Sequence, residues 1–273
     1  MNIAFWSNVR HQSGVTAGVA LISVLWVEMF VEEIAVTSNH ICNHSLMQRL
    51  YGGIEQEEKI AKKTYSYVLG EPEYFRMLYS GKVQKTLWLS ENLRFIPMES
   101  RESELFSIEG LDEINKRMSG KEHLMIDTAC GYGLSSQKIL EEAELTVVMF
   151  PPCRECIDSF FQSESSLCKD SFFILGNYLK EESWLTTYLT RRYGIPEERM
   201  GVIPYNPGFA QAMKAGDTIS YITRNMNCSK RNGEYHWIYN AKKTVKRLRE
   251  YMMSRRFLCE EYERVPEESS GGD

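Results

Sequence analysis

The sequence has no surplus of positive charge and no even set of cysteines. Its 273 residues include 32 lysines and arginines against 37 aspartates and glutamates, a formal net charge of -5. This balance argues against a general affinity for nucleic acid, although a local basic patch is compatible with it. The seven cysteines are odd in number and scattered, which is typical of reduced thiols in a cytoplasm rather than of a disulfide framework.

The sequence also has no apolar segment of the length typical of a membrane-spanning helix. The longest apolar run, residues 15–31, is short for a span and contains Glu28. It follows a predicted strand rather than a basic start, so a helix buried against a sheet explains it better than a membrane segment. We therefore expect a cytoplasmic protein.

The chain is long enough, and at 43% hydrophobic residues apolar enough, to bury one large core. We expect a single domain over residues 1–263 and a disordered acidic tail over residues 264–273. Apolar runs predict strands at residues 2–6, 33–38, 93–97, 123–128, 145–150, 171–175 and 200–203. Helical spacing predicts helices at residues 15–30, 54–69, 73–79, 108–118, 183–193 and 237–262, and another after Gly133. We expect an irregular segment from Pro204. Alternating strands and helices indicate an α/β fold with a mostly parallel sheet covered on both faces.

The first strand runs into the helix at residues 15–30 through a polar loop. Such a loop aims free backbone N–H groups and the positive end of the helix dipole at one point, which is an anion site. The phosphate-binding motif G-x-x-x-x-G-K-[ST] finds Gly14 and Thr16 in register, with Val9 and Val15 at the positions of its first Gly and its Lys. These residues alone fit either an ordinary strand-turn-helix or a phosphate loop.

An acid stands at the end of another apolar strand, residues 123–128. Because the carboxyl ends of parallel strands face one crevice, Asp127 would share that crevice with the first loop. It could hold a magnesium ion there, directly or through water.

Taken in order, these stretches resemble the deviant-Walker ATPase family that includes ParA, MinD and the pilus-locating TadZ proteins. The family's loop falls on residues 10–16 (RHQSGVT), and its acidic strand end falls on residues 126–131 (IDTACG). Its Asn after the next strand is similar to Asn177 in LGNY, and its following Ile-Pro segment is similar to residues 202–206. The resemblance covers residues 1–251.

The resemblance implies a three-layer α/β/α P-loop fold. It implies ATP and Mg²⁺ as cofactors, bound weakly or not at all. Gly14 and Thr16 would then contact phosphate and magnesium, and Asp127 would belong to the magnesium shell. Asn177 and the Pro204 backbone would contact the base.

Two family lysines are absent from the loop. Arg10 occupies the position of the lysine that reaches the partner's nucleotide, and its guanidinium can replace that charge. Val15 occupies the position of the lysine that neutralises the terminal phosphates. Losing that contact should cost about 1.5–3 kcal/mol.

The family's switch acids would fall near Ser38 and His40, and neither is a carboxylate. Because phosphoryl transfer depends on positioning and charge neutralisation, hydrolysis should suffer more than binding. We therefore assign no catalytic residue.

Three functions remain open. The leading hypothesis is a cytoplasmic positioning or scaffold factor with a degenerate nucleotide site, peripheral at the membrane or cell pole. Its partners would be proteins of a pilus, secretion or partition apparatus, and the family's habit implies a homodimer. The alternatives are a working ATPase that uses Arg10, and an interaction module that binds no nucleotide.

Other clusters carry less chemistry. His40, Cys42 and His44 match no zinc spacing and favour a polar loop. Cys153 and Cys156 form a C-x-x-C, but we expect it to follow a strand without opening a helix, so two incidental thiols are favoured. Cys130 occupies the place of a cluster ligand in a related iron protein, but the second cysteine is missing.

Residues 242–256 form a basic helical stretch. It is the one candidate for DNA or membrane contact. A closing helix, whose apolar stripe packs on the sheet while its charges are solvated, is the favoured interpretation.

Overall fold

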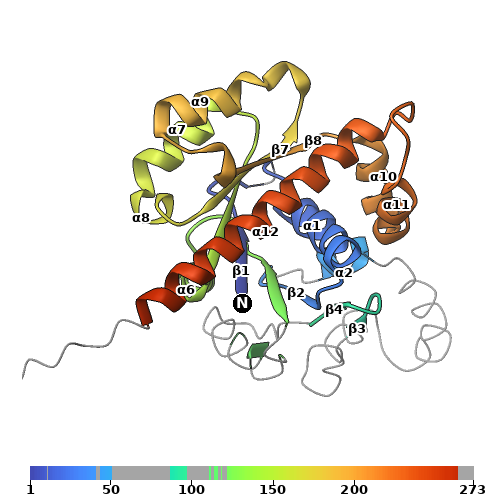
Figure 1. Ribbon diagram of the computed structural model, residues 1–273, viewed down its shortest axis with the longest axis horizontal. Helices are drawn as coiled ribbons and strands as arrows, with labels where there is room; N and C mark the ends of the chain where they lie inside the picture. The colour runs from blue at the N-terminus through green and yellow to red at the C-terminus, as the bar shows by residue number, and fades with distance from the viewer. Residues whose placement is uncertain are drawn as a thin grey trace, which may run out of the picture.

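The computed structural model describes residues 1–10, 12–40, 44–50, 87–96, 111, 114, 115, 118 and 122–263. Its centre is an eight-stranded sheet in the order β3-β4-β2-β5-β1-β6-β7-β8 (Figure 1). Every pairing is parallel except the antiparallel pair of β3 and β4 at one edge. The strands are β1 (Asn2–Trp6), β2 (Ile34–Ser38), β3 (Leu87–Trp88), β4 (Leu93–Phe95), β5 (His123–Asp127), β6 (Leu145–Phe150), β7 (Phe172–Tyr178) and β8 (Met200–Pro204).

β1 lies in the interior of the sheet, between β5 and β6. Its residues Ile3 to Trp6 are fully buried, because a parallel strand covered on both faces needs apolar side chains at every position. Successive side chains enter opposite faces. Ile3 and Phe5 belong to one core, whereas Ala4 and Trp6 face the other side.

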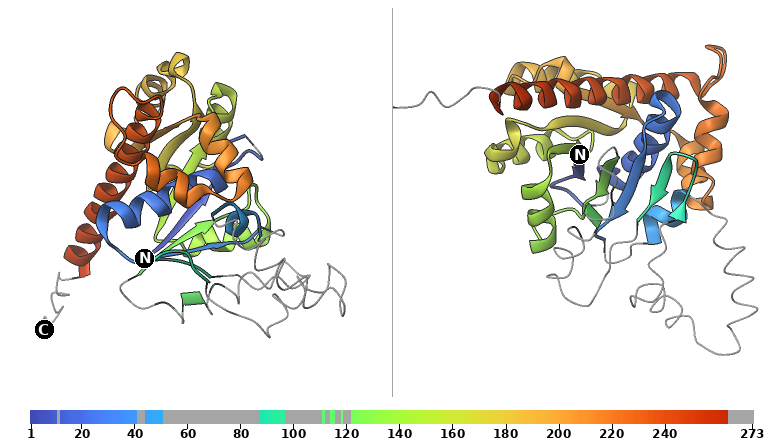
Figure 2. Two further views of the ribbon diagram at one scale, coloured as in Figure 1. Left: turned by 90° about the vertical axis from the view of Figure 1, so that its right-hand side faces the viewer. Right: turned by 60° about the horizontal axis from the view of Figure 1, so that its bottom comes forward.

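Helices cover both faces (Figure 2). The Ile3 and Phe5 face carries α1 (Val15–Phe30), α10 (Pro207–Ala215), α11 (Thr218–Asn225) and α12 (Tyr235–Glu263). The opposite face carries α6 (Leu134–Glu142), α7 (Arg154–Ser163) and α9 (Trp184–Tyr193). Shorter elements are α2 (His44–Leu50), α8 (Ser165–Cys168), and the 3-10 turns η1 (Lys180–Glu182) and η2 (Glu197–Arg199).

The long helix α12 crosses the molecule and packs on the edge strand β8 (Figure 1). Thr244 Oγ1 accepts a hydrogen bond from Val202 N at 2.9 Å and donates one to Val202 O at 2.8 Å. Gly201 permits this approach, because an added Cβ would lie 2.3 Å from Thr244 Cγ2.

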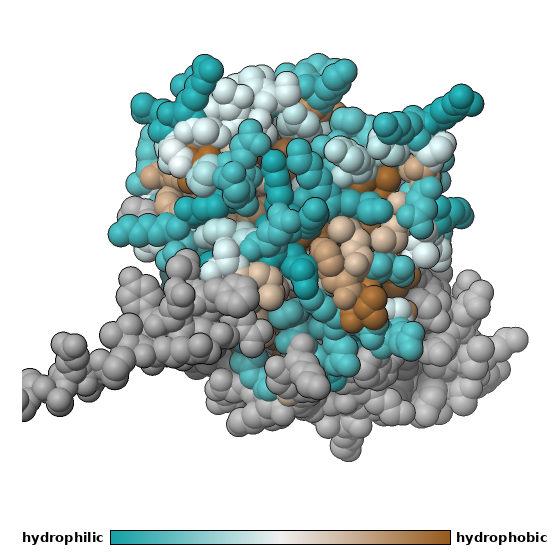
Figure 3. All heavy atoms as spheres, viewed as in Figure 1, coloured by the Kyte–Doolittle hydropathy of each residue, from teal (hydrophilic) through white to brown (hydrophobic). Residues whose placement is uncertain are grey.

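The outer side of α12 is charged. Figure 3 shows a mostly hydrophilic surface along its course. Arg249 pairs with Glu32 at 2.6 Å and Arg247 with Glu197 at 3.1 Å, while Val245 and Leu248 are buried. As expected, α12 packs its apolar side chains on the sheet and directs its charged side chains outward.

The predicted three-layer α/β/α architecture is confirmed, and seven predicted strands appear within a few residues of their bounds. The expected irregular segment after Pro204 was wrong, because it contains α10 and α11. Four further elements were not predicted, namely β3, α2, α7 and α8. The helices predicted at 54–69 and 73–79, most of the one at 108–118, Cys42 and the tail at 264–273 lie outside the described residues. Among the helices described, none combines the length and apolarity needed to cross a bilayer.

Candidate functional site

The loop between β1 and α1 ends on Gly14, which has φ 72° and ψ 31°. This left-handed conformation favours glycine, because any other side chain would crowd its own backbone. Gly14 O accepts the first helical hydrogen bond from Gly18 N at 2.8 Å. The free N–H groups of the first turn of α1 are therefore at the carboxyl edge of the sheet, where an anion would bind.

The loop rests on the end of β7. Asn177 Nδ2 donates to Gln12 O at 3.1 Å, and an added Cβ on Gly176 would lie 2.2 Å from Ser13 O. Asn177 has φ 52°, and the pairing register shifts between Leu175 and Tyr178. This irregularity turns the Asn177 side chain toward the loop. In this structure the amide holds the loop that was expected to bind phosphate.

The loop that follows β5 lies beside the loop that follows β1. Trp6 Nε1 donates to Gly131 O at 3.1 Å, and Gly131 N donates to Ser7 O at 3.4 Å. The Ser13 side chain hydrogen-bonds the Cys130 thiol, whose pKa is raised by burial and by the charge of Asp127. The two stretches singled out in the sequence therefore meet at one edge of the sheet.

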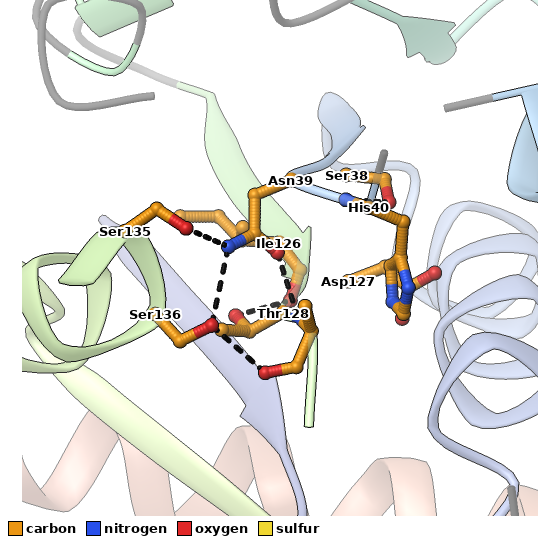
Figure 4. A network of polar contacts seen from close by, with 9 residues as sticks. Ser38, Asn39, His40, Ile126, Asp127, Thr128, Ser135 and Ser136 are labelled. Carbon is orange, nitrogen blue, oxygen red and sulfur yellow. Dashed lines mark hydrogen bonds and ion pairs between the residues drawn. The ribbon is translucent and has the colours of Figure 1, made fainter. Parts of the chain in front are cut away.

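Asp127, the last residue of β5, is fully buried. Its Oδ1 lies 3.3 Å from His40 Nε2, just beyond β2 (Figure 4). Burial alone would lower the pKa of His40, but the hydrogen bond and the charge of Asp127 outweigh it and raise the pKa above 6.5. Asp127 Oδ2 is buried and has no hydrogen-bond partner among the described residues.

Asn39 ties the ends of β2 and β5 together (Figure 4). Its Oδ1 accepts from Ala129 N at 2.6 Å, and its Nδ2 donates to Ser135 Oγ at 3.2 Å and Ser136 Oγ at 3.3 Å. Ser136 Oγ in turn donates to Ala129 O at 2.9 Å. Asn39 was not predicted as a site residue, because its partners become neighbours only through the parallel pairing of β2 with β5.

A pocket of about 480 Å³ opens beside the loop. Three predicted site residues, Gly14, Asn177 and Pro204, line it together. Its remaining lining comes from α1, α2, α10 and the strand ends, namely Ala17, Gly18, Arg49, Met149, Gly176, Ile203, Tyr205, Asn206, Phe209, Ala210, Met213 and Lys214. The walls are largely apolar and two cationic side chains are present, which suits a flat ring system carrying an anionic group.

The other predicted residues take different positions. Val15 is only 5% exposed and belongs to the core under α1, so its side chain cannot contact a nucleotide. Thr16 is half-buried in the first turn of α1, and Arg10 is exposed on the loop. The positive charge of Arg10 partly opposes the rise in the pKa of the Cys130 thiol.

The donor set for magnesium is small. In the part of the chain that the structure describes, no three His, Cys, Asp or Glu side chains gather to hold a metal. Asp127 Oδ2 is a buried carboxylate oxygen without a partner among those residues, and it could accept a hydrogen bond from a magnesium-bound water. Magnesium commonly binds through one carboxylate, waters and substrate phosphates, so the site fits it only together with a nucleotide.

Comparison with known proteins finds solved structures of the same fold. No family model and no curated protein matches the sequence. Among solved structures, MinD of Pyrococcus horikoshii complexed with Mg-ADP matches with a TM-score of 0.61 and 14% identity, over 93% of this chain and 99% of that one. Apo McdA of Cyanthece matches with a TM-score of 0.59 and 12% identity, over 92% and 98%.

A third structure, the ParA family ATPase of Chlorobium tepidum, matches with a TM-score of 0.58 and 12% identity, over 89% of this chain and 96% of that one. Identities this low establish the architecture and leave ligands and partners to other evidence. The chain has the P-loop fold shared by MinD and ParA-family ATPases.

Proposed function

We propose that this chain is a MinD- and ParA-like protein with a degenerate nucleotide site, which binds ATP weakly and hydrolyses it slowly or not at all. The observation that carries the proposal is that Gly14, Asn177 and Pro204, three residues far apart in sequence, line one pocket beside the first turn of α1. This is the place where a parallel α/β sheet binds ligands.

In the proposed complex the base enters the pocket between the apolar side chains of Met149 and Phe209. The phosphates face the free N–H groups at the start of α1. Thr16 and the free oxygen of Asp127 are the residues that would hold magnesium, which would neutralise phosphate charge when bound.

The same residues account for weak activity. Val15 supplies no charge to the terminal phosphates, and its side chain is committed to the core. At the end of β2 the base His40 stands where the resemblance expects an acid, and it occupies one oxygen of Asp127. No described residue at the end of β2 is a carboxylate that would orient a water for attack, so hydrolysis should be weakened more than nucleotide binding.

A positioning or scaffold role follows from a fold that binds a nucleotide without turning it over. One similar structure is a complex of MinC with MinD from Aquifex aeolicus, matching at a TM-score of 0.58. By analogy with it, and with the TadZ-like character of the loop, the partners proposed here are proteins of a pilus, secretion or partition apparatus. Assembly as a homodimer and peripheral attachment at the membrane or cell pole belong to the same proposal.

One observation favours the working ATPase as the second candidate. Arg10 is exposed, so its guanidinium is free to reach a nucleotide held by a second copy. In that case turnover should be measurable and should disappear in Arg10→Ala.

The test is equilibrium binding of a labelled ATP analogue with magnesium, followed by a turnover assay. We expect micromolar binding without turnover. Ala210→Trp, which fills the pocket, should weaken binding at least tenfold, on the order of 1.4 kcal/mol. Ala215→Trp places the same side chain at an exposed position of α10 and is the control. No binding at millimolar ligand would leave an interaction module instead.

A further inference from the structure

Cys153 and Cys156 stand at the start of a helix. The strand β6 ends at Phe150, and Cys153 is the N-cap of α7 (Arg154–Ser163). The interpretation of this C-x-x-C as two incidental thiols rested on the expectation that no helix follows it, and that expectation was wrong. Cys156 therefore lies in the first turn, on the same side of the helix as Cys153.

The two sulfurs touch. The Cys156 thiol donates to Cys153 Sγ at 3.0 Å, and the Cys153 thiol donates to Glu155 Oε2 at 3.2 Å. Both cysteines are partly exposed. The hydrogen bonds run from the inner sulfur through the outer one to the exposed carboxylate of Glu155. The proton that Cys153 loses on reaction goes to solvent.

The other described cysteines are placed differently. The Cys168 thiol donates to Glu164 O at 3.1 Å, and Cys130 is hydrogen-bonded to the Ser13 side chain. A metal does not explain the pair, because a zinc site needs four ligands, and the described residues contain no group of three His, Cys, Asp or Glu side chains arranged to hold a metal ion.

We propose that Cys153 and Cys156 form a dithiol–disulfide exchange site that reacts with small-molecule disulfides such as oxidised glutathione. Cys153 Sγ, after its proton has left, attacks one sulfur of the reagent; the reagent's S–S bond breaks, and one thiol leaves. Cys156 Sγ then loses its proton and attacks Cys153 Sγ, expelling the second thiol. In total the protein loses two protons and two electrons, and the reagent gains them.

The order of attack follows from the surroundings of the two sulfurs. Burial and the hydrogen bond to Cys153 raise the pKa of Cys156 to about 11. Cys156 therefore keeps its proton while Cys153 reacts, and resolves the mixed disulfide afterwards. The backbone of Cys156 is held by the loop after β1, because Cys156 O accepts a hydrogen bond from Asn8 Nδ2 at 3.1 Å.

The experiment uses the full reduced chain in glutathione buffers of increasing oxidised fraction, quenched with acid and alkylated. Peptide masses should show Cys153 and Cys156 becoming protected together, with two hydrogens lost and no glutathione retained. Cys168 and Cys228 are internal controls and should stay alkylated at the same oxidised fraction. The readout needs no nucleotide, so it is independent of the proposed function.

Two variants separate the roles. Cys156→Ser should accumulate one glutathione on Cys153, because the adjacent resolving sulfur has been removed, whereas Cys153→Ser should retain little glutathione on Cys156. Circular dichroism checks that both variants are folded. The proposal is overturned if Cys153 and Cys156 are alkylated as readily as Cys228 throughout the series, or if the wild-type chain retains a stable adduct instead of closing.

Discussion

His40 Nε2 lies 3.3 Å from Asp127 Oδ1, where β2 and β5 end side by side. The pair is largely hidden: Asp127 is fully buried and the His40 side chain is 30% exposed. In the family that the chain resembles, the strand equivalent to β2 would deliver an acid to this place. Here it delivers a base, so the charge facing Asp127 is reversed.

The pair predicts a pH-dependent stability. Because the folded pKa of His40 is raised above 6.5, its contribution is fully present below pH 6.5 and is lost as the pH rises through the folded pKa. Replacing His40 with Gln should cost about 1–3 kcal/mol near pH 6, since a buried acceptor loses its charged donor. The difference between wild type and variant should shrink toward pH 8.5 in urea titrations.

A control is available in His236, which is exposed on α12. His236→Gln should lower the free energy of unfolding little at any pH. If His40→Gln shows a difference that grows with pH, the charge assignment at Asp127 is wrong.

Removing the Asn39 side chain should loosen the site. Asn39→Ala leaves Ala129 N without its acceptor and the Ser135 and Ser136 hydroxyls without their donor, and should cost about 1–3 kcal/mol. Amide exchange at Ala129 should speed up by at least tenfold. Asn240→Ala, which loses contacts only within α12, is the matched control. Equal exchange at Ala129 in both variants would deny Asn39 this role.

Gly14 and Gly194 allow the backbone cost to be separated from the site. Both are left-handed, with φ 72° and 66°, and alanine at either should cost about 1–2 kcal/mol. An added Cβ at Gly194 meets no described atom within 4 Å, whereas at Gly14 it lies 3.3 Å from Asn177 Nδ2. Gly14→Ala should therefore be the more destabilising in urea titrations and should also weaken nucleotide binding. Equal losses of stability would show that the Asn177 side chain moves away from the added Cβ at no cost in stability.

Restoring the missing lysine should not restore binding. Val15→Lys removes a buried side chain from the core and should cost about 1.5–3 kcal/mol, measured by chemical denaturation. Val31→Lys, at the other end of α1 and 77% exposed at that position, should cost far less. Tighter binding of the ATP analogue by folded Val15→Lys would mean that the loop rearranges to free this position.

Much of the scaffold could be predicted from local pattern. The buried strands are continuous apolar runs, so β1, β5 and β6 were predicted close to their observed bounds. The missed elements are short or polar: α7 and α8 carry few buried residues, and β3 has two residues. Their existence depends on packing against neighbours rather than on periodicity.

For the candidate site the division is similar. Gly14 and Asp127 could be found because one begins a helix and the other ends a strand, and parallel strands present those ends at one edge. Asn177 and Pro204 were expected there only because of the resemblance to the deviant-Walker family. The partners of these residues could not be predicted. That the Asn177 side chain would hold the Gln12 carbonyl, and that His40 would turn to Asp127, depends on groups more than 80 residues apart in sequence.

By itself the sequence determined the succession of the seven parallel strands, the burial of β1 and the loss of charge at position 15, because hydrophobic periodicity and residue chemistry act locally. The tertiary structure decided that Val15 faces the core, that a base closes on Asp127 and that two thiols meet at the start of α7. These are distances between side chains, and only the packing of helices onto the sheet sets them.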